Sequence, residues 1–167
     1  MLTLLLMRHA KSDWEAPHGD DHARPLAKRG KKAAASMGKR LTQLGLAPEK
    51  ILSSSAERAR STARAAAKSG RWAAELEVTD AFYEASPEAV IATVRELEEA
   101  PATLLLVGHE PTWSQLLSTL IGGGNFRFPT GAVAALEVDA AGWAELGPGR
   151  CRLLWLLTPK LVEKGED

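Results

Sequence analysis

Two of the four histidines follow the two most apolar segments of the chain. His9 comes two residues after the apolar run Leu2–Met7, and His109 comes two residues after the run Ala102–Val107. A single histidine at the end of a strand is more often a hydrogen-bonded structural residue than a catalytic one. Two histidines in equivalent positions favour a functional site instead.

Two arginines also lie near the ends of expected strands. Arg8 precedes His9, and Arg58 falls in the first turn of an Ala/Arg-rich helix that follows a short strand. The planar guanidinium group binds two phosphate oxygens at once, so Arg8 and Arg58 are suited to hold a phosphoryl group. Arg60 and Arg64 are interpreted as part of a solvated helix face.

Two arginines and two histidines around one edge of a sheet suit a tetrahedral dianion. A neutral imidazole carries a free lone pair near pH 7 and can attack phosphorus in line. Phosphoryl transfer needs little beyond positioning and charge stabilisation, and cationic side chains supply both. We therefore expect phosphoryl chemistry without a cofactor and without a metal.

The elements that must position these residues alternate along the chain. Ser86 and Pro87 are typical of a helix start, and Gly45 and Gly122 are typical of helix ends. Residues 11–24 are polar and predict a loop, and residues 160–167 are expected to be frayed. The pattern predicts strands at residues 2–7, 50–54, 76–78, 102–107, 132–138 and 152–157, and helices at 26–44, 56–68, 87–99 and 112–121.

This alternation predicts an α/β protein, a three-layer α/β/α sandwich with a mainly parallel central sheet. The last two strands follow each other without a long helix, so that edge of the sheet is expected to be antiparallel. In such sheets sites form beyond the carboxyl ends of the strands, which is where His9 and His109 fall.

Length and composition limit the number of domains and the classes of binding partner. The 167 residues fit a single domain, 1–167, and 21 basic residues balance 21 acidic ones. This balance gives no support to nucleic-acid or membrane binding. The one cysteine, Cys151, is expected to be a small core residue. No signal peptide or membrane-spanning run is evident, so a cytoplasmic location is the default expectation.

Three motifs together resemble the histidine phosphatase superfamily, which includes the cofactor-dependent phosphoglycerate mutases. They are Leu6-Met7-Arg8-His9-Ala10, the Ser-rich turn with Arg58 and Thr62-Ala63, and Gly108-His109-Glu110. The segments around Arg24-Pro25-Leu26 and Tyr83-Glu84-Ala85-Ser86-Pro87 are similar to the compact SixA-type phosphohistidine phosphatases. The resemblance implies a phosphoglycerate mutase-like fold without a lid insertion.

The resemblance also implies roles. His9 would become the phosphohistidine, Arg8 and Arg58 would hold the phosphoryl group, and His109 would donate a hydrogen bond to it. Larger members use a carboxylic acid near Glu84 to protonate the leaving oxygen, but Glu84 also suits the start of a helix.

Arg24 and Ser12 are two further candidate site residues, and each has two possible roles. Arg24 is either an accessory cation of the phosphate pocket or the partner of Asp20 or Asp21. Ser12 either caps the loop or contacts phosphate.

Three functions remain in competition. The first is a metal-independent phosphatase that acts through phospho-His9 on phosphohistidine carried by a protein. The second is a phosphatase of small phosphoesters, which a secure acid role for Glu84 would favour. The third is an inactive module that binds phosphate or phosphopeptides, and the presence of all core residues argues against it. A mutase is disfavoured because no lid segment would shield the phosphoenzyme from water.

Overall fold

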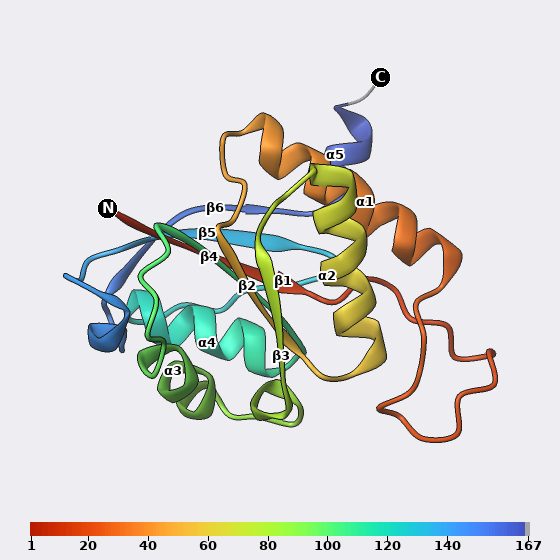
Figure 1. Cartoon of the computed structure of the whole chain (residues 1–167), viewed down its shortest axis with the longest axis horizontal. Helices are drawn as coiled ribbons and strands as arrows, with labels where there is room; N and C mark the ends of the chain where they lie inside the picture. Colours follow the sequence, from red (N-terminus) through yellow and green to blue (C-terminus); the bar gives the residue numbers. More distant parts are fainter. Residues whose placement is uncertain (166–167) are drawn as a thin grey trace.

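The computed structural model describes residues 1–165, in which a six-stranded mixed sheet is covered by helices on both faces (Figure 1). The strand order is β3-β2-β4-β1-β5-β6. The first four strands in sequence are parallel, and β5 and β6 run antiparallel at one edge. The strands are β1 (Leu2–Arg8), β2 (Lys50–Ser54), β3 (Glu75–Thr79), β4 (Thr103–Gly108), β5 (Val133–Val138) and β6 (Cys151–Leu157). The predicted architecture and its antiparallel edge are therefore confirmed.

The central strands are buried on both faces, which explains their uninterrupted apolar sequence. In β1, Leu4 and Leu6 contribute to the core on one face, whereas Leu5 and Met7 contribute to the core on the other. The two faces of the sheet are covered by different helices, as Figure 1 shows. On one face lie α1 (Lys28–Gln43), α2 (Glu57–Gly70) and α5 (Pro159–Lys164). On the other face lie α3 (Pro87–Arg95) and α4 (Thr112–Ile121). Two short 3₁₀ turns, η1 (Asp80–Phe82) and η2 (Trp143–Glu145), complete the set.

The predicted helix boundaries need correction at two places. The first helix begins at Lys28 because Ala27, which follows Pro25-Leu26, is extended. The third ends at Arg95 rather than near Glu99, because its last buried residue is Val94 and only a partly buried Leu97 follows.

The expectation of a frayed C-terminus is wrong for residues 160–164. The Thr158 hydroxyl accepts a hydrogen bond from the Leu161 amide, Pro159 occupies the first turn, and Val162 is buried against the α1 face. Residues 166–167 of that predicted tail lie outside the described residues. Across residues 1–165, no helix combines the length and the apolar character that crossing a membrane requires.

The sheet brings three strand ends together. Arg8 and Gly108 are register partners on the neighbouring parallel strands β1 and β4, so the next residues are His9 and His109. On the other side of β4, Ser53 of β2 pairs with Val107, which places Ser54 beside the same end. The backbone amide of His9 donates to the Gly108 carbonyl at 2.9 Å and locks the two ends to each other.

Candidate active site

The two histidine rings lie next to each other at these strand ends. Their ring centroids are 5.2 Å apart, and the ring planes are tilted by 54°. Both side chains are buried, with 7% of His9 and 9% of His109 exposed. The structure thus brings together the two histidines that the sequence analysis placed at one edge of the sheet.

The backbone determines the orientation of His9. Its Nδ1 atom lies 2.8 Å from the carbonyl oxygen of Ala10, and a carbonyl can only accept, so Nδ1 carries the hydrogen. The Ala10 amide in turn donates to Thr62 Oγ1 at 2.9 Å, and Thr62 Oγ1 donates to the Arg58 carbonyl at 2.7 Å. This chain of bonds ties the segment after β1 to the first turn of α2. In the neutral ring, Nε2 then keeps a free lone pair.

His109 is held by a side chain instead. Its Nε2 atom lies 2.8 Å from Oγ of Ser54, the last residue of β2. Gly108, just before it, is required by packing, because a Cβ at that position would lie 2.1 Å from the ring of Trp113. Trp113 is fully buried in the core, so it does not flank the site.

Burial keeps both rings neutral. Desolvation lowers the pKa of His9 to about 3, with His109, Arg58 and Arg8 adding to the shift against the Ala10 hydrogen bond. Desolvation likewise lowers the pKa of His109 to about 4, with the positive charge of Arg58 as the next cause. Both imidazoles are therefore uncharged at neutral pH, which leaves His9 able to act as a nucleophile.

The two guanidinium groups are held by different parts of the chain. Arg8 donates from Nη1 to the Phe128 carbonyl at 3.0 Å. Arg58 is buried and donates from Nη1 and Nη2 to the carbonyl and the carboxylate of Asp21, at 2.8 and 3.0 Å. Within residues 1–165, five buried side-chain nitrogens have no hydrogen-bond partner, namely Arg8 Nε, Arg58 Nε, His109 Nδ1, Arg60 Nε and Trp113 Nε1.

Buried polar nitrogens are normally paired, so their lack of partners needs an explanation. Three of the five belong to residues that the sequence analysis selected for the phosphate site, Arg8, Arg58 and His109. A phosphoryl group offers three acceptor oxygens, and the two arginine nitrogens are donors that suit such a group.

Asp21 was not singled out as a site residue, yet it connects three of the site's donors. Its carboxylate accepts hydrogen bonds from Arg24, from Arg58 at 3.0 Å and from the Tyr83 hydroxyl at 2.7 Å. These bonds, with that of Tyr83 the strongest influence, hold the pKa of Asp21 well below its usual range. A carboxylate in a polar loop carries no sequence pattern that identifies such partners, because Arg58 and Tyr83 lie 37 and 62 residues away.

Arg24 and Ser12 support this cluster. Arg24 is buried, pairs with Asp21 through Nη1, and donates from Nε to Ser12 Oγ at 3.0 Å. Its guanidinium carbon lies 3.5 Å from the ring centroid of Trp14, which is 67% exposed. The structure therefore shows Arg24 paired with Asp21, which is one of its two interpretations. Ser12 is bound to Arg24, which is neither of the two interpretations given for it.

A pocket of about 370 Å³ opens beside these groups. Arg58 and His109 line it together with Asp21, Tyr83 and Glu84. Glu84 has a φ of 52°, a left-handed conformation that is costly for a residue with a side chain. Such strain clusters at functional sites, so the position of Glu84 in the pocket wall supports its candidacy.

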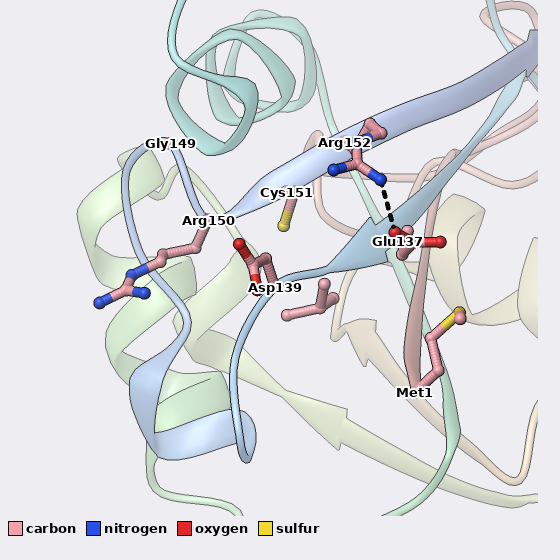
Figure 2. Close-up of a pocket in the computed structure, with 8 residues that line it drawn as sticks. Met1, Glu137, Asp139, Gly149, Arg150, Cys151 and Arg152 are labelled. Atoms are coloured by element: carbon pink, nitrogen blue, oxygen red, sulfur yellow. Dashed lines mark hydrogen bonds and ion pairs between the residues drawn. The ribbon is translucent and has the colours of Figure 1, made fainter.

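A larger cavity of about 480 Å³ lies at the other end of the sheet (Figure 2). Met1 and Cys151 line it with charged residues, among which Arg152 and Glu137 form an ion pair of 2.9 Å. Burial raises the pKa of the Cys151 thiol to about 12, so the thiol is protonated at neutral pH. This cavity offers no activated nucleophile, and the chemistry favours the smaller pocket, which is lined by His109 and Arg58 but not by His9 or Arg8.

The described residues hold no group of three or more His, Cys, Asp and Glu side chains that could bind a metal ion. The donors at the site are arginine and imidazole nitrogens, which suit an anion rather than a cation.

Comparison with known proteins supports the resemblance drawn from the motifs. The family model of the histidine phosphatase superfamily (branch 1) matches residues 4–90, about half of the chain. An uncharacterized protein of Mycobacterium tuberculosis is 38% identical over 165 residues, which covers 92% of this chain and 100% of the relative. An uncharacterized chloroplastic protein of Arabidopsis thaliana is 30% identical over 169 residues, or 93% of this chain and 77% of the relative.

Solved structures with the same fold include two proteins proposed to be SixA phosphohistidine phosphatases. The one from Nakamurella multipartitia has a TM-score of 0.84 at 26% identity and covers 95% of this chain and 96% of its own. The one from Agrobacterium tumefaciens has a TM-score of 0.78 at 29% identity and covers 95% of this chain and 98% of its own. These matches confirm the predicted fold.

Proposed function

The chain belongs to the histidine phosphatase superfamily, and from this premise and the geometry of the site we propose that it is a phosphatase that works through a phosphohistidine on His9. The observation that carries the proposal is the Nδ1 hydrogen bond of His9 to the Ala10 carbonyl. It leaves the Nε2 lone pair free beside Arg8, Arg58 and His109, whose unpartnered nitrogens suit phosphoryl oxygens.

The reaction has two balanced steps. In the first, the Nε2 lone pair forms a bond to phosphorus while the bond from phosphorus to the leaving atom breaks, and the leaving atom takes that electron pair and a proton from solvent. In the second, water attacks phosphorus and releases a proton to solvent, and the Nε2 atom takes back the electron pair of the broken N–P bond. Arg8, Arg58 and His109 stabilise the charge on the three equatorial oxygens in both transition states.

For the substrate, we propose phosphohistidine carried on a protein. Support comes from the likeness to proteins proposed to be SixA phosphohistidine phosphatases and from the short connection between Glu84 and Gly108, which holds only α3 and β4 as ordered elements. An imidazole leaves more readily than an alkoxide, so this substrate depends little on a strong general acid.

The experiment is to trap the phosphoenzyme by rapid quenching after mixing with ³²P-labelled phosphoramidate. We expect a label that is acid-labile and alkali-stable and that is lost in His9→Ala. His18→Ala is the matched control, because His18 also bonds a nearby carbonyl through Nδ1 but lies in the polar loop and does not line the pocket at Arg58. A label that survives in His9→Ala would contradict the proposal, and phosphate binding without any turnover would favour a binding module instead.

The strained position of Glu84 in the pocket wall favours one further candidate, a phosphatase of small phosphoesters in which Glu84 protonates the leaving oxygen. Glu84→Gln separates the two. If Glu84 is the acid, hydrolysis of a sugar phosphate falls by about 10²–10⁴-fold, because general acids contribute that much when the leaving group is poor. Hydrolysis of a phosphohistidine protein should change little under the first proposal.

A further inference from the structure

We propose that Ser54 is a positioning residue that fixes His109 in the tautomer with its hydrogen on Nδ1, so that a neutral His109 donates to the phosphoryl group. The inference rests on the proposed function for its catalytic meaning, but the tautomer itself is a property of the resting protein. Ser54 is fully buried at the end of β2, and its Oγ lies 2.8 Å from His109 Nε2.

The Ser54 hydroxyl has few hydrogen-bonding positions, and its neighbours determine how each is used. A serine hydroxyl has one hydrogen to donate and two lone pairs to accept. The Ala56 amide, at 3.3 Å, already donates to one of the lone pairs of Ser54. Among the residues that the structure describes, His109 Nε2 is the one group bonded to Ser54 Oγ that can accept the hydroxyl hydrogen.

The opposite tautomer would leave a hydrogen unpaired. If His109 carried its hydrogen on Nε2 and donated to Ser54, the hydroxyl hydrogen of Ser54 would have no acceptor in a fully buried place. An unpaired buried donor is costly, which should bias the tautomer equilibrium by roughly tenfold or more. The ring therefore accepts at Nε2 and carries its hydrogen on Nδ1.

The Nδ1 atom of His109 is the ring nitrogen that is left free to bind substrate. It is buried and has no hydrogen-bond partner within residues 1–165, and it belongs to a ring that lines the pocket beside Arg58. A hydrogen on Nδ1 can donate to a phosphoryl oxygen, whereas a bare Nδ1 lone pair would repel one. Ser54 thus decides whether His109 attracts or repels the substrate.

The first measurement is the tautomer of His109 in the wild-type protein, from ¹⁵N chemical shifts and long-range ¹H–¹⁵N couplings at pH 7. We expect the pattern of an Nδ1–H ring for His109, with His109→Gln used to assign the signal. An Nε2–H pattern would overturn the inference even if the enzyme proves to be a phosphatase, so this readout is independent of the proposed function.

The second measurement compares Ser54→Ala with Ser53→Ala by the hydrolysis of p-nitrophenyl phosphate. Ser53 is the matched control because it is equally buried, but its hydroxyl bonds a backbone carbonyl. We expect kcat to fall about tenfold in Ser54→Ala with KM within twofold, to recover in Ser54→Thr, and to stay within twofold in Ser53→Ala. Equal losses in Ser54→Ala and Ser53→Ala, or an unchanged kcat in Ser54→Ala, would overturn it. If Ser54→Ala fails to fold, the wild-type tautomer still decides.

Discussion

His9 and His109 occupy equivalent positions after neighbouring parallel strands, but the protein holds them in opposite ways. His9 donates from Nδ1 to the backbone carbonyl of Ala10, whereas His109 bonds the Ser54 hydroxyl through Nε2. Burial lowers the pKa of both rings, to about 3 and about 4. The difference between the two histidines is therefore not charge but the nitrogen that is left free.

This difference teaches how one residue type can serve two proposed roles. A carbonyl accepts only, so it forces His9 to expose the Nε2 lone pair that a nucleophile needs. A hydroxyl can donate, so Ser54 allows His109 to expose a hydrogen that a phosphoryl oxygen needs. The hydrogen-bond partner of each imidazole ring therefore determines whether the ring is suited to be the nucleophile or the hydrogen-bond donor.

Removal of the nucleophile should have the largest effect. In His9→Ala, kcat should fall by about 10⁴-fold or more, because the covalent route is lost and only charge stabilisation remains. Steady-state turnover of p-nitrophenyl phosphate measures it, with His18→Ala as the control that keeps wild-type turnover. A loss of only tenfold in His9→Ala would mean that another group attacks phosphorus.

Removal of the donor should cost less. In His109→Ala, kcat should fall by about 10²–10³-fold, the usual loss when one donor to a developing oxyanion is deleted. The phosphoenzyme should still form on His9, only more slowly, and rapid quenching with a ³²P-labelled substrate measures its rate. If His109→Ala abolishes the label as completely as His9→Ala does, the division between nucleophile and donor is wrong.

The sequence predicted much of the placement of the two histidines, because apolar runs reveal where strands end. Apolar runs located β1 and β4, and the parallel sheet then required Arg8, His9 and His109 to meet. The roles of these residues stay predictions, but their proximity follows from patterns that burial on both faces imposes on a strand.

What the sequence did not reveal depends on long-range contacts. Asp21 looked like any acidic residue of a polar loop, and its importance arises from Arg58 and Tyr83, which only the folded chain brings near. Ser54 left a faint signal, a buried hydroxyl at the end of a strand, but its partner is 55 residues away. The short helix α5 was missed because it is stabilised by packing of Val162 rather than by its length.

The support behind His9 can be tested at Thr62. Thr62→Val keeps the shape but leaves the buried Ala10 amide without its acceptor. The free energy of unfolding should fall by about 1–3 kcal/mol, the cost of an unpaired buried donor, and kcat should fall about tenfold because the Ala10 carbonyl orients His9. Urea unfolding and steady-state kinetics measure the two losses, and Thr62→Ser should restore both. Wild-type behaviour of Thr62→Val would show that the backbone alone orients His9.

The smallest effect concerns stability against pH and tests whether both rings are buried in the neutral form. The folded pKa values of His9 and His109, about 3 and about 4, lie below the ordinary imidazole value of about 6.5. Between each folded value and about pH 6.5, the unfolded chain therefore binds more protons than the folded protein does. Stability is thus complete above about pH 6.5 and falls as the pH drops towards 4, by about 2 kcal/mol per histidine at pH 5. Urea unfolding at pH 7 and pH 5 should therefore show a drop that is smaller by about 2 kcal/mol in His9→Gln and in His109→Gln than in the wild type. If only one of the two variants shows the smaller drop, the other histidine is charged in the folded protein, and the two rings differ in charge as well as in the nitrogen that is left free.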